Sequence, residues 1–239
     1  MGDEMIVRDV DAAAPVPAVG GVVETDLSFA IGEQVGIVMN PGGVHAESIR
    51  VLRTQLLGQH FGLGRRGLAM VSPSGDNGCT STAVNLGVAI AQTGAKTLLI
   101  DADLQTPRVH ELIVPSRPLP GLRQLLTEAD TNLFDVVQED VLPNFSVLFA
   151  GGATDRSQEL IAGARFRAVV DQAIRDWDVV LIDTPPANVS ADARQIGQLV
   201  DYVLMVVGRD QSYVADVEAL VRELKSDGSH IVGVALIES

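Results

Sequence analysis

Short apolar runs recur along most of the chain and alternate with longer segments whose apolar residues are spaced as on a helix. The runs predict strands at residues 67–72, 97–102, 145–150, 178–183, 202–207 and 231–237. Successive apolar positions are typical of central parallel strands that are buried on both faces. Helices are predicted at about 45–60, 79–93, 107–113, 121–127, 157–176, 190–199 and 212–226.

This alternation indicates the fold class. Strands separated by helices imply right-handed βαβ crossovers, and hence an α/β fold with a doubly wound, mostly parallel sheet and helices on both faces. Ligands of such sheets bind at the carboxyl ends of the strands. Before the pattern begins, a stretch rich in Ala, Pro and Gly predicts a flexible N-terminal leader over residues 1–43, followed by a single domain over residues 44–239.

The segment between the first predicted strand and the next helix has the form of a phosphate-binding loop. Its sequence is Val71-Ser-Pro-Ser-Gly-Asp-Asn-Gly-Cys-Thr80. In the consensus G-x-x-x-x-G-K-[ST], backbone N–H groups at a helix N-terminus face an anion. The fold is therefore expected to be of the P-loop NTPase type. The candidate nucleotide contacts are Gly75, Asp76, Asn77, Gly78, Cys79, Thr80 and Ser81.

This loop departs from the consensus at two positions. Pro73 stands where the first glycine belongs, and Cys79 stands where the lysine belongs. The only lysines are Lys96 and Lys225, and neither is near the loop in sequence. A cysteine at a helix N-terminus can have a lowered thiol pKa, so a redox-active or nucleophilic Cys79 is an alternative interpretation.

Carboxylates follow two of the predicted strands. Asp101 and Asp103 come after one strand and Asp183 ends another. Mg²⁺ prefers oxygen ligands and accepts one or two carboxylates together with phosphates and water. We therefore expect Asp101, Asp103 and Asp183 to be catalytic, with Thr80, Asp103 and Asp183 as metal ligands. The alternative for each aspartate is that it caps the following helix.

Composition excludes several other functions. The 17 Lys and Arg against 31 Asp and Glu give a net charge of −14, which argues against nucleic acid as a partner. A single cysteine cannot form an intrachain disulfide or a cysteine-based zinc cluster. No apolar run reaches the roughly 18–20 residues that span a bilayer.

Several ordered motifs resemble the cytoplasmic domain of the bacterial tyrosine kinases (BY-kinases), which belong to the MinD/ParA-type P-loop ATPases. Asp101-Ala-Asp-Leu-Gln-Thr-Pro-Arg-Val-His110 resembles the second Walker-type motif of that family, and Leu181-Ile-Asp-Thr-Pro-Pro186 resembles its Walker B motif. The segment from Glu47 to Arg53 matches E-x-x-R-x-x-R. The resemblance implies that Glu47, Arg50 and Arg53 mediate homo-oligomerisation.

The resemblance also implies cofactors, partners and a cellular role. The cofactors would be ATP or ADP with Mg²⁺, and the partner a membrane polysaccharide co-polymerase that regulates chain length. The domain would lie in the cytoplasm, recruited by that partner to the inner face of the membrane, and regulate capsule or exopolysaccharide synthesis and export.

Two functional hypotheses remain from the sequence. In the first, the substitution of lysine by Cys79 leaves a pseudokinase with weak or absent nucleotide binding and little kinase activity. In the second, the chain is an active ATP-dependent protein-tyrosine autokinase in which another cation replaces the lysine. A partition-type ATPase is a third alternative. The family's arginine after D-A-D-L is Gln105 here, and the only tyrosines are Tyr202 and Tyr213.

Overall fold

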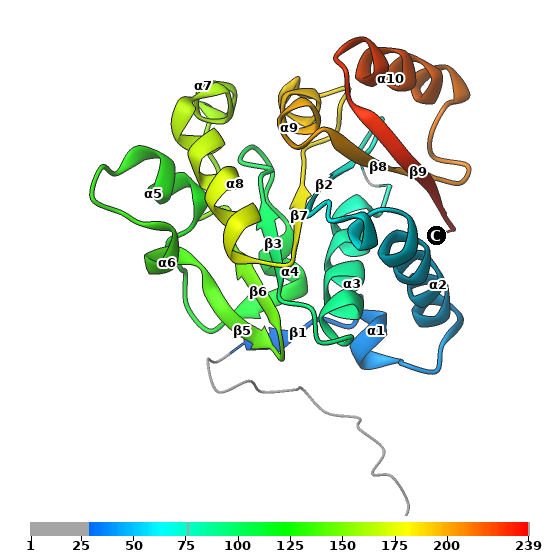
Figure 1. Cartoon of the computed structure of the whole chain (residues 1–239), viewed down its shortest axis with the longest axis horizontal. Coiled ribbons are helices and arrows are strands. Elements are labelled where there is room, and N and C mark those ends of the chain that lie inside the picture. Colours follow the sequence, from blue (N-terminus) through cyan, green and yellow to red (C-terminus); the bar gives the residue numbers. More distant parts are fainter. Residues whose placement is uncertain (1–28, 76, 239) are drawn as a thin grey trace, which may run out of the picture.

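The computed structural model describes residues 29–75 and 77–238, and all structural statements refer to these residues. Seven strands form one sheet in the order β5-β6-β3-β7-β2-β8-β9 (Figure 1). All neighbours pair in parallel except β5, which is antiparallel to β6. This confirms the predicted mostly parallel α/β sheet. The strands are β2 (Gly67–Val71), β3 (Thr97–Asp101), β5 (Gln138–Leu142), β6 (Phe145–Leu148), β7 (Val179–Asp183), β8 (Tyr202–Gly208) and β9 (His230–Ile237).

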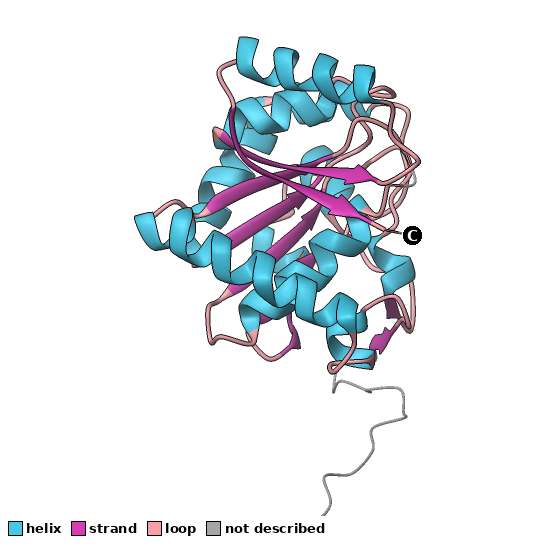
Figure 2. Cartoon of the chain, turned by 90° about the vertical axis from the view of Figure 1, so that its right-hand side faces the viewer, coloured by secondary structure: helices cyan, strands magenta, loops and turns pink. Residues whose placement is uncertain are grey.

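Helices cover both faces of the sheet (Figure 2). Alternate residues of each strand point to opposite faces, so Leu68 and Met70 of β2 join one core while Ala69 and Val71 join the other. The first core contains α2 and α3, and the second contains α5 to α10. The helices are α1 (Gly36–Met39), α2 (Val44–Gln59), α3 (Cys79–Ala91), α4 (Val109–Leu112), α5 (Leu122–Thr127), α6 (Leu133–Val136), α7 (Ser157–Ala162), α8 (Ala164–Asp176), α9 (Asp192–Val200) and α10 (Val214–Ser226).

The predicted leader is too long at its C-terminal end. Strand β1 (Phe29–Ile31) pairs with β4 (Ile113–Pro115), and the side chains of Phe29, Ile31 and Ile37 are buried. The amide side chain of Asn85, in α3, accepts the Ile37 N–H and donates to the Gln34 carbonyl. Apolar burial and these bonds therefore make residues 29–43 part of the domain. Residues 1–28 of the predicted leader lie outside the described residues.

Two predicted helices also differ from the structure. The segment 157–176 forms α7 and α8, which are separated at Gly163, where the backbone is extended with φ −70° and ψ 148°. The helix predicted at 107–113 is shortened to α4, because the chain enters strand β4 at Ile113. None of the helices in the described part of the chain is long and apolar enough to cross a membrane.

Strand β9 is an outer strand of the sheet and pairs only with β8 among the described residues. Helix α2 covers part of one face of β9, around Val232. Further along the strand, Val234 is 57% exposed and Leu236 is 62% exposed. An uncharged strand edge with two exposed aliphatic side chains therefore remains at the surface.

Candidate nucleotide-binding site

The carboxyl ends of three adjacent central strands meet at the predicted site. Asp101 of β3 lies opposite Asp183 of β7, and Met70 of β2 lies opposite Asp183 on the other side. The Ala102 N–H donates to the Asp183 carbonyl at 2.9 Å, which extends the pairing beyond β3. The sheet therefore brings Asp101 and Asp183 close to residues 72–78, the loop after β2 that resembles a phosphate-binding loop and is called the phosphate-type loop below.

The loop after β2 ends at Gly78, where α3 begins. Gly78 has φ 70°, a left-handed conformation that costs a residue with a side chain more than it costs glycine. Its carbonyl accepts bonds from the N–H and the hydroxyl of Thr82 and from the Ser81 hydroxyl. The buried Asn77 side chain donates to the Ser74 carbonyl at 2.9 Å and closes the loop. The candidate contact Asp76 lies outside the described residues.

Cys79, the first residue of α3, is buried with 8% of its surface exposed. Burial, and then the negative charge of the nearby Asp183 carboxyl group, raise the pKa of its thiol well above the ordinary value. The alternative of a lowered thiol pKa at the helix N-terminus is therefore wrong, because burial and a nearby carboxylate outweigh the helix dipole. Cys79 is a neutral thiol where the consensus has a cation.

Asp101 and Asp183 are buried carboxyl groups with unsatisfied oxygens. Both side-chain oxygens of Asp183 and Oδ1 of Asp101 lack a hydrogen-bond partner of standard geometry within the described residues. Burial raises the pKa of Asp183 to about 7, although Thr80 and Cys79 favour its ionised form. Burial, and then the charges of Asp183 and Asp103, raise the pKa of Asp101 well above its usual range. These oxygens thus form a site that would favour a bound cation.

Asp103 has a different environment, because the turn that follows it uses both of its oxygens. Its Oδ1 accepts the N–H groups of Gln105 and Thr106, and its Oδ2 accepts the Thr106 hydroxyl at 2.9 Å. The alternative interpretation, in which an aspartate caps the following helix, fits Asp101 instead, because its Oδ2 accepts the N–H of Val109, the first residue of α4, at 3.3 Å. The bonds of Asp103 stabilise a turn over residues 103–106. Each carboxylate oxygen has two lone pairs, so the bonds leave capacity for a further ligand.

The fold implies a bound magnesium ion, and the oxygen atoms at this site can be compared with the ligands that Mg²⁺ prefers. No group of three or more His, Cys, Asp or Glu side chains in the described part of the chain could hold a metal ion by itself. Mg²⁺ is usually held by one or two carboxylates together with phosphate oxygens and water. The unsatisfied oxygens of Asp183 and the nearby Thr80 hydroxyl fit such a partial ligand set.

The phosphate-type loop is held by hydrogen bonds from the segment after β7, which were not predicted from the sequence. The segment after Asp183 packs along this loop: the Ala187 N–H donates to the Ser72 carbonyl at 2.9 Å, and the Asn188 N–H donates to the Pro73 carbonyl at 3.2 Å. The Thr184 hydroxyl donates to the Met70 carbonyl at 2.8 Å. The Thr-Pro-Pro sequence after the strand marks a rigid turn, but these backbone partners depend on which strands are neighbours.

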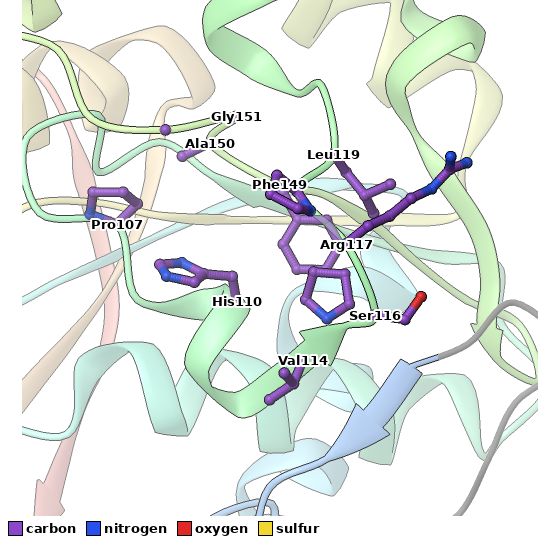
Figure 3. A pocket seen from close by; sticks show the side chains of 12 residues that line it. Pro107, His110, Val114, Ser116, Arg117, Leu119, Phe149, Ala150 and Gly151 are labelled. Atoms are coloured by element: carbon purple, nitrogen blue, oxygen red, sulfur yellow. The ribbon is translucent and has the colours of Figure 1, made fainter.

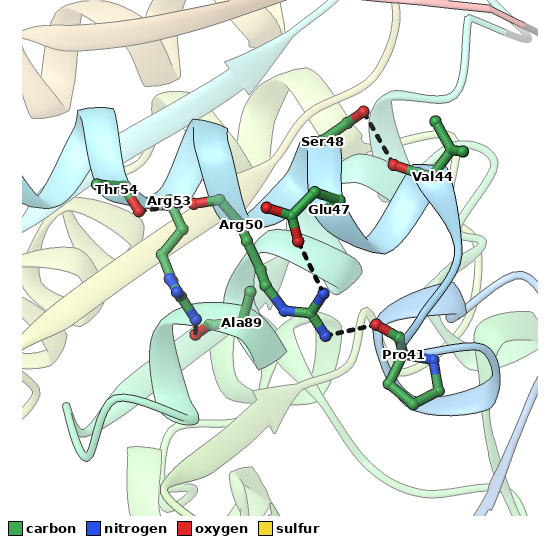
Figure 4. Close-up of polar contacts among 8 residues, drawn as sticks. All are labelled: Pro41, Val44, Glu47, Ser48, Arg50, Arg53, Thr54 and Ala89. Carbon is green, nitrogen blue, oxygen red and sulfur yellow. Dashed lines mark hydrogen bonds and ion pairs between the residues drawn. The ribbon is translucent and has the colours of Figure 1, made fainter.

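The three predicted assembly residues lie along α2 (Figure 4). Arg50 forms an ion pair with Glu47 at 3.2 Å and donates to the Pro41 carbonyl at 2.7 Å. Arg53 is half-buried and donates to the carbonyl of Ala89, in α3, at 3.2 Å. Within one chain, therefore, Glu47 pairs with Arg50, and Arg53 connects α2 to α3. Their role between subunits remains a prediction.

Sequence comparisons identify relatives of the chain. The model of a family described as "AAA domain" matches residues 66–227. The tyrosine-protein kinase Wzc of Salmonella typhi is 30% identical over 206 residues, and the tyrosine-protein kinase Etk of Escherichia coli is 31% identical over 202 residues. These matches cover 85% and 83% of this chain but only 28% and 27% of the relatives. CapB of Staphylococcus aureus is 27% identical, with 82% of this chain and 85% of CapB covered.

Solved structures give the same result. The kinase domain of the Escherichia coli tyrosine kinase ETK is 29% identical with a TM-score of 0.80, covering 85% of this chain and 79% of that domain. The cell division ATPase MinD of Pyrococcus furiosus is 25% identical with a TM-score of 0.62, covering 72% of this chain and 71% of MinD. The chain therefore belongs to the AAA-domain family and, within it, to the bacterial tyrosine-kinase (BY-kinase) domains, whose fold it shares with MinD-type ATPases.

Proposed function

We propose that the chain is a regulatory BY-kinase-like domain that binds Mg·ATP or Mg·ADP weakly and has little kinase activity. The neutral, buried thiol of Cys79 at the lysine position carries this proposal. Among the main influences on the pKa values of Asp101 and Asp183, none comes from a lysine or arginine. Where a phosphate-binding loop normally provides a lysine, the described part of the chain has this neutral thiol.

The remaining elements support residual nucleotide binding. Gly78 permits close approach of the backbone to a phosphate, and the N-terminus of α3 presents the positive end of the helix dipole. Thr80 and Asp183 would hold Mg²⁺, with Asp103 as a further ligand. Bound Mg²⁺ would neutralise phosphate charge. Asp101, which lies beside Asp183, would take the proton of an incoming hydroxyl group.

The magnitude of the weakening follows from the missing interaction. A charge-assisted hydrogen bond contributes about 1.5–3 kcal/mol. Its loss corresponds to a reduction in affinity of about 10- to 150-fold. The effect on phosphoryl transfer is expected to be larger, because transfer depends mainly on positioning and on stabilising charge at the γ-phosphoryl oxygens.

The biological role follows by analogy with the relatives. We propose that the domain assembles as a homo-oligomer through the α2 surface of Glu47, Arg50 and Arg53. In this role it binds a membrane polysaccharide co-polymerase at the inner face of the membrane and regulates capsule or exopolysaccharide synthesis and export. The relatives named as tyrosine-protein kinases support the kinase-family part of this assignment. The resemblance of the sequence motifs to BY-kinases supports the assembly, the partner and the role in polysaccharide export.

Calorimetric titration with Mg·ATP tests the proposal. The parent chain should bind weakly, and Cys79→Lys should bind about 10- to 150-fold more tightly. Cys79→Ala is the matched control, because it removes the thiol without adding a cation, and its affinity should stay close to that of the parent. A phosphorylation assay with a tyrosine-containing peptide should show little transfer by the parent.

The alternative is an active tyrosine autokinase in which an arginine of a neighbouring subunit replaces the lysine. In that case the parent would bind Mg·ATP tightly, Cys79→Lys would bring no improvement, and peptide phosphorylation would be readily detected. That combination of results would replace the proposal of a weakened domain with that of an active kinase.

A further inference from the structure

Strand β9 is one of the two outer strands of the seven-stranded sheet (Figure 1). The other outer strand, β5, has features that hinder pairing with a further strand. These are the exposed acidic side chains of Glu139 and Asp140, a positive φ of 49° at Asp140, and an irregular register with β6. Residues 231–237 of β9 carry no charge. Of the two outer strands, β9 is therefore the one suited to accept a further strand.

A bulge determines which part of β9 has a regular edge. The register with β8 passes directly from Ile231 to Gly233, so Val232 is an extra residue. A bulge bends the strand and interrupts its hydrogen-bonding edge. From Gly233 to Ile237 the pairing with β8 is regular, and this stretch has the geometry that strand addition requires.

The alternation along β9 decides which backbone groups face away from β8. The Ile237 carbonyl accepts the N–H of Arg209, directly after β8, at 2.8 Å, so the peptide groups of Ile237 face β8. In a paired strand the hydrogen-bonding groups of successive residues point to alternate sides. Those of Ala235 therefore also face β8, and those of Val234 and Leu236 face outward. The aliphatic side chains of Val234 and Leu236 are exposed as well.

These two residues complement each other about a twofold axis. In an antiparallel second copy with the axis at Ala235, Val234 of each copy lies opposite Leu236 of the other. Each such pair exchanges both of its N–H···O bonds, which satisfies the outward-facing backbone groups of residues 233–237. The side chains form aliphatic cross-strand pairs, which stabilise a sheet.

A small groove between α2 and β9 gives these side chains a further apolar contact. Val234 lines the groove together with Leu52 and Gln55 of α2. Its volume of about 60 Å³ is far below the roughly 300–1,000 Å³ of small-molecule sites, but it can hold the end of an aliphatic side chain. Opposite residues of an antiparallel pair share a face, so Leu236 of the second copy would lie on the groove side of the sheet.

The charges at the two ends of β9 favour the antiparallel direction. His230 begins the strand, and Glu238, which follows it, forms an ion pair with Arg209. A parallel copy in register would place Glu238 beside Glu238, whereas an antiparallel copy places it at the His230 end. An antiparallel contact is also closed by its twofold symmetry, so it gives a dimer and not a growing filament.

We infer that β9 is the pairing edge for a second copy of this chain, giving a twofold-symmetric dimer whose sheet is continuous through Val234 and Leu236. This contact is separate from the α2 surface of Glu47, Arg50 and Arg53. It requires neither a nucleotide nor phosphoryl transfer, so it does not rest on the proposed function. The contact is small and each copy has a charge of −14, so the dimer is weak and is strengthened by salt.

Sedimentation velocity of the full chain measures this dimer between about 1 μM and about 1 mM protein, the range in which small interfaces dissociate. We expect a monomer–dimer equilibrium that shifts towards the dimer as salt is added. An interface held by ion pairs would instead weaken with salt. The Arg50→Ala/Arg53→Ala variant should keep the dimer, because neither arginine is part of the β9 edge.

Charged variants of the exposed residues test which side chains pair. Val234→Lys should weaken dimerisation at least about tenfold, because it removes both symmetric cross-strand pairs at once. Val234→Lys/Leu236→Glu should restore dimerisation, because each lysine then lies opposite a glutamate. Val214→Lys, at an exposed valine of α10, is the matched control and should dimerise like the parent. All three positions are exposed, so the variants are expected to fold, which circular dichroism checks.

Cysteine cross-linking tests the position of the axis. Ala235→Cys places the two thiols opposite each other in a non-hydrogen-bonded pair, whose Cα atoms are about 4.5 Å apart, a separation that a disulfide can bridge. Under mild oxidation this variant should form a covalent dimer faster than Val214→Cys, which controls for random collision. The native Cys79 is buried and is present in both variants.

Three results would overturn the inference. A chain that stays monomeric up to about 1 mM at high salt would show that the edge does not pair with a second copy, and would leave it to a strand of another protein. A dimer that Val234→Lys keeps and Arg50→Ala/Arg53→Ala loses would place the contact on α2. Slow hydrogen exchange of the Val234 and Leu236 amides in the monomer would show that another segment of the same chain covers the edge.

Discussion

Replacing Asp183 by asparagine should change how the stability of the apo protein depends on pH. The pKa of this buried carboxyl group is raised from an ordinary value of 3.8 to about 7. Between these values the unfolded chain is ionised while the folded chain stays protonated. The folded state thus binds more protons in this window, so the free energy of unfolding falls as pH rises from about 4 to about 7.

The size of this effect follows from the two pKa values. A difference of one pKa unit corresponds to about 1.4 kcal/mol, so the change from 3.8 to about 7 gives an upper limit of about 4 kcal/mol. The raised pKa of Asp101 acts in the same direction. The free energy of unfolding of a small domain is only about 5–15 kcal/mol. Ionisation of the Asp183 carboxyl group therefore removes a large part of this free energy. Asp183→Asn should therefore be more stable than the parent at pH 8.

Urea unfolding between pH 4 and pH 8, in the presence of a chelator and without nucleotide, measures the effect. The parent should lose stability over this range, and Asp183→Asn should lose clearly less. Asp171→Asn, at an exposed aspartate of α8, is the control and should follow the parent curve. Parallel curves for the parent and Asp183→Asn would refute the argument that burial raises the pKa of this carboxyl group.

Two further predictions concern assembly and packing. Light scattering should show a lower oligomeric mass for the Arg50→Ala/Arg53→Ala variant than for the parent. An unchanged mass would contradict the role of these arginines in assembly. If the parent itself is monomeric, that role is restricted to assembly on a membrane partner. Ser157→Ala should cost about 1–3 kcal/mol in urea unfolding, because it leaves the buried Asp192 carboxylate without the Ser157 hydroxyl bond. The exposed Ser48→Ala is its control, and a cost equal to that of the control would contradict the argument.

The central strands could be predicted because each is a continuous apolar run. Asp101 and Asp183 could be placed at the site for the same reason, since each ends such a run and parallel strands share one carboxyl edge. The order of the strands could not be derived from periodicity. It is this order that pairs Asp101 with Asp183 and brings Ala187 to the carbonyl of Ser72.

The errors arose where contacts between distant segments decide the outcome. Residues 29–43 look like a continuation of the Pro- and Gly-rich segment, and their burial depends on β4 and on Asn85, far along the chain. The alternative interpretation of Cys79, a lowered thiol pKa at a helix N-terminus, also considered only the local sequence, whereas burial and Asp183 raise this pKa. The cavity lined by Phe149 and the segment around α4 (Figure 3) could not be predicted, because its walls come from separate segments.

The outer strand β9 affects how the protein behaves in concentrated solution. Residues 231–237 contain no charged residue or proline that would hinder the addition of another strand, and Val234 and Leu236 add exposed apolar surface. Repulsion between copies that each carry a charge of −14 opposes such contacts. Salt shortens the range of this repulsion to about 8 Å at physiological ionic strength. Near the isoelectric point of about 4.5 the repulsion disappears, so colloidal stability depends on the acidic surface and is lost on acidification even while the fold persists.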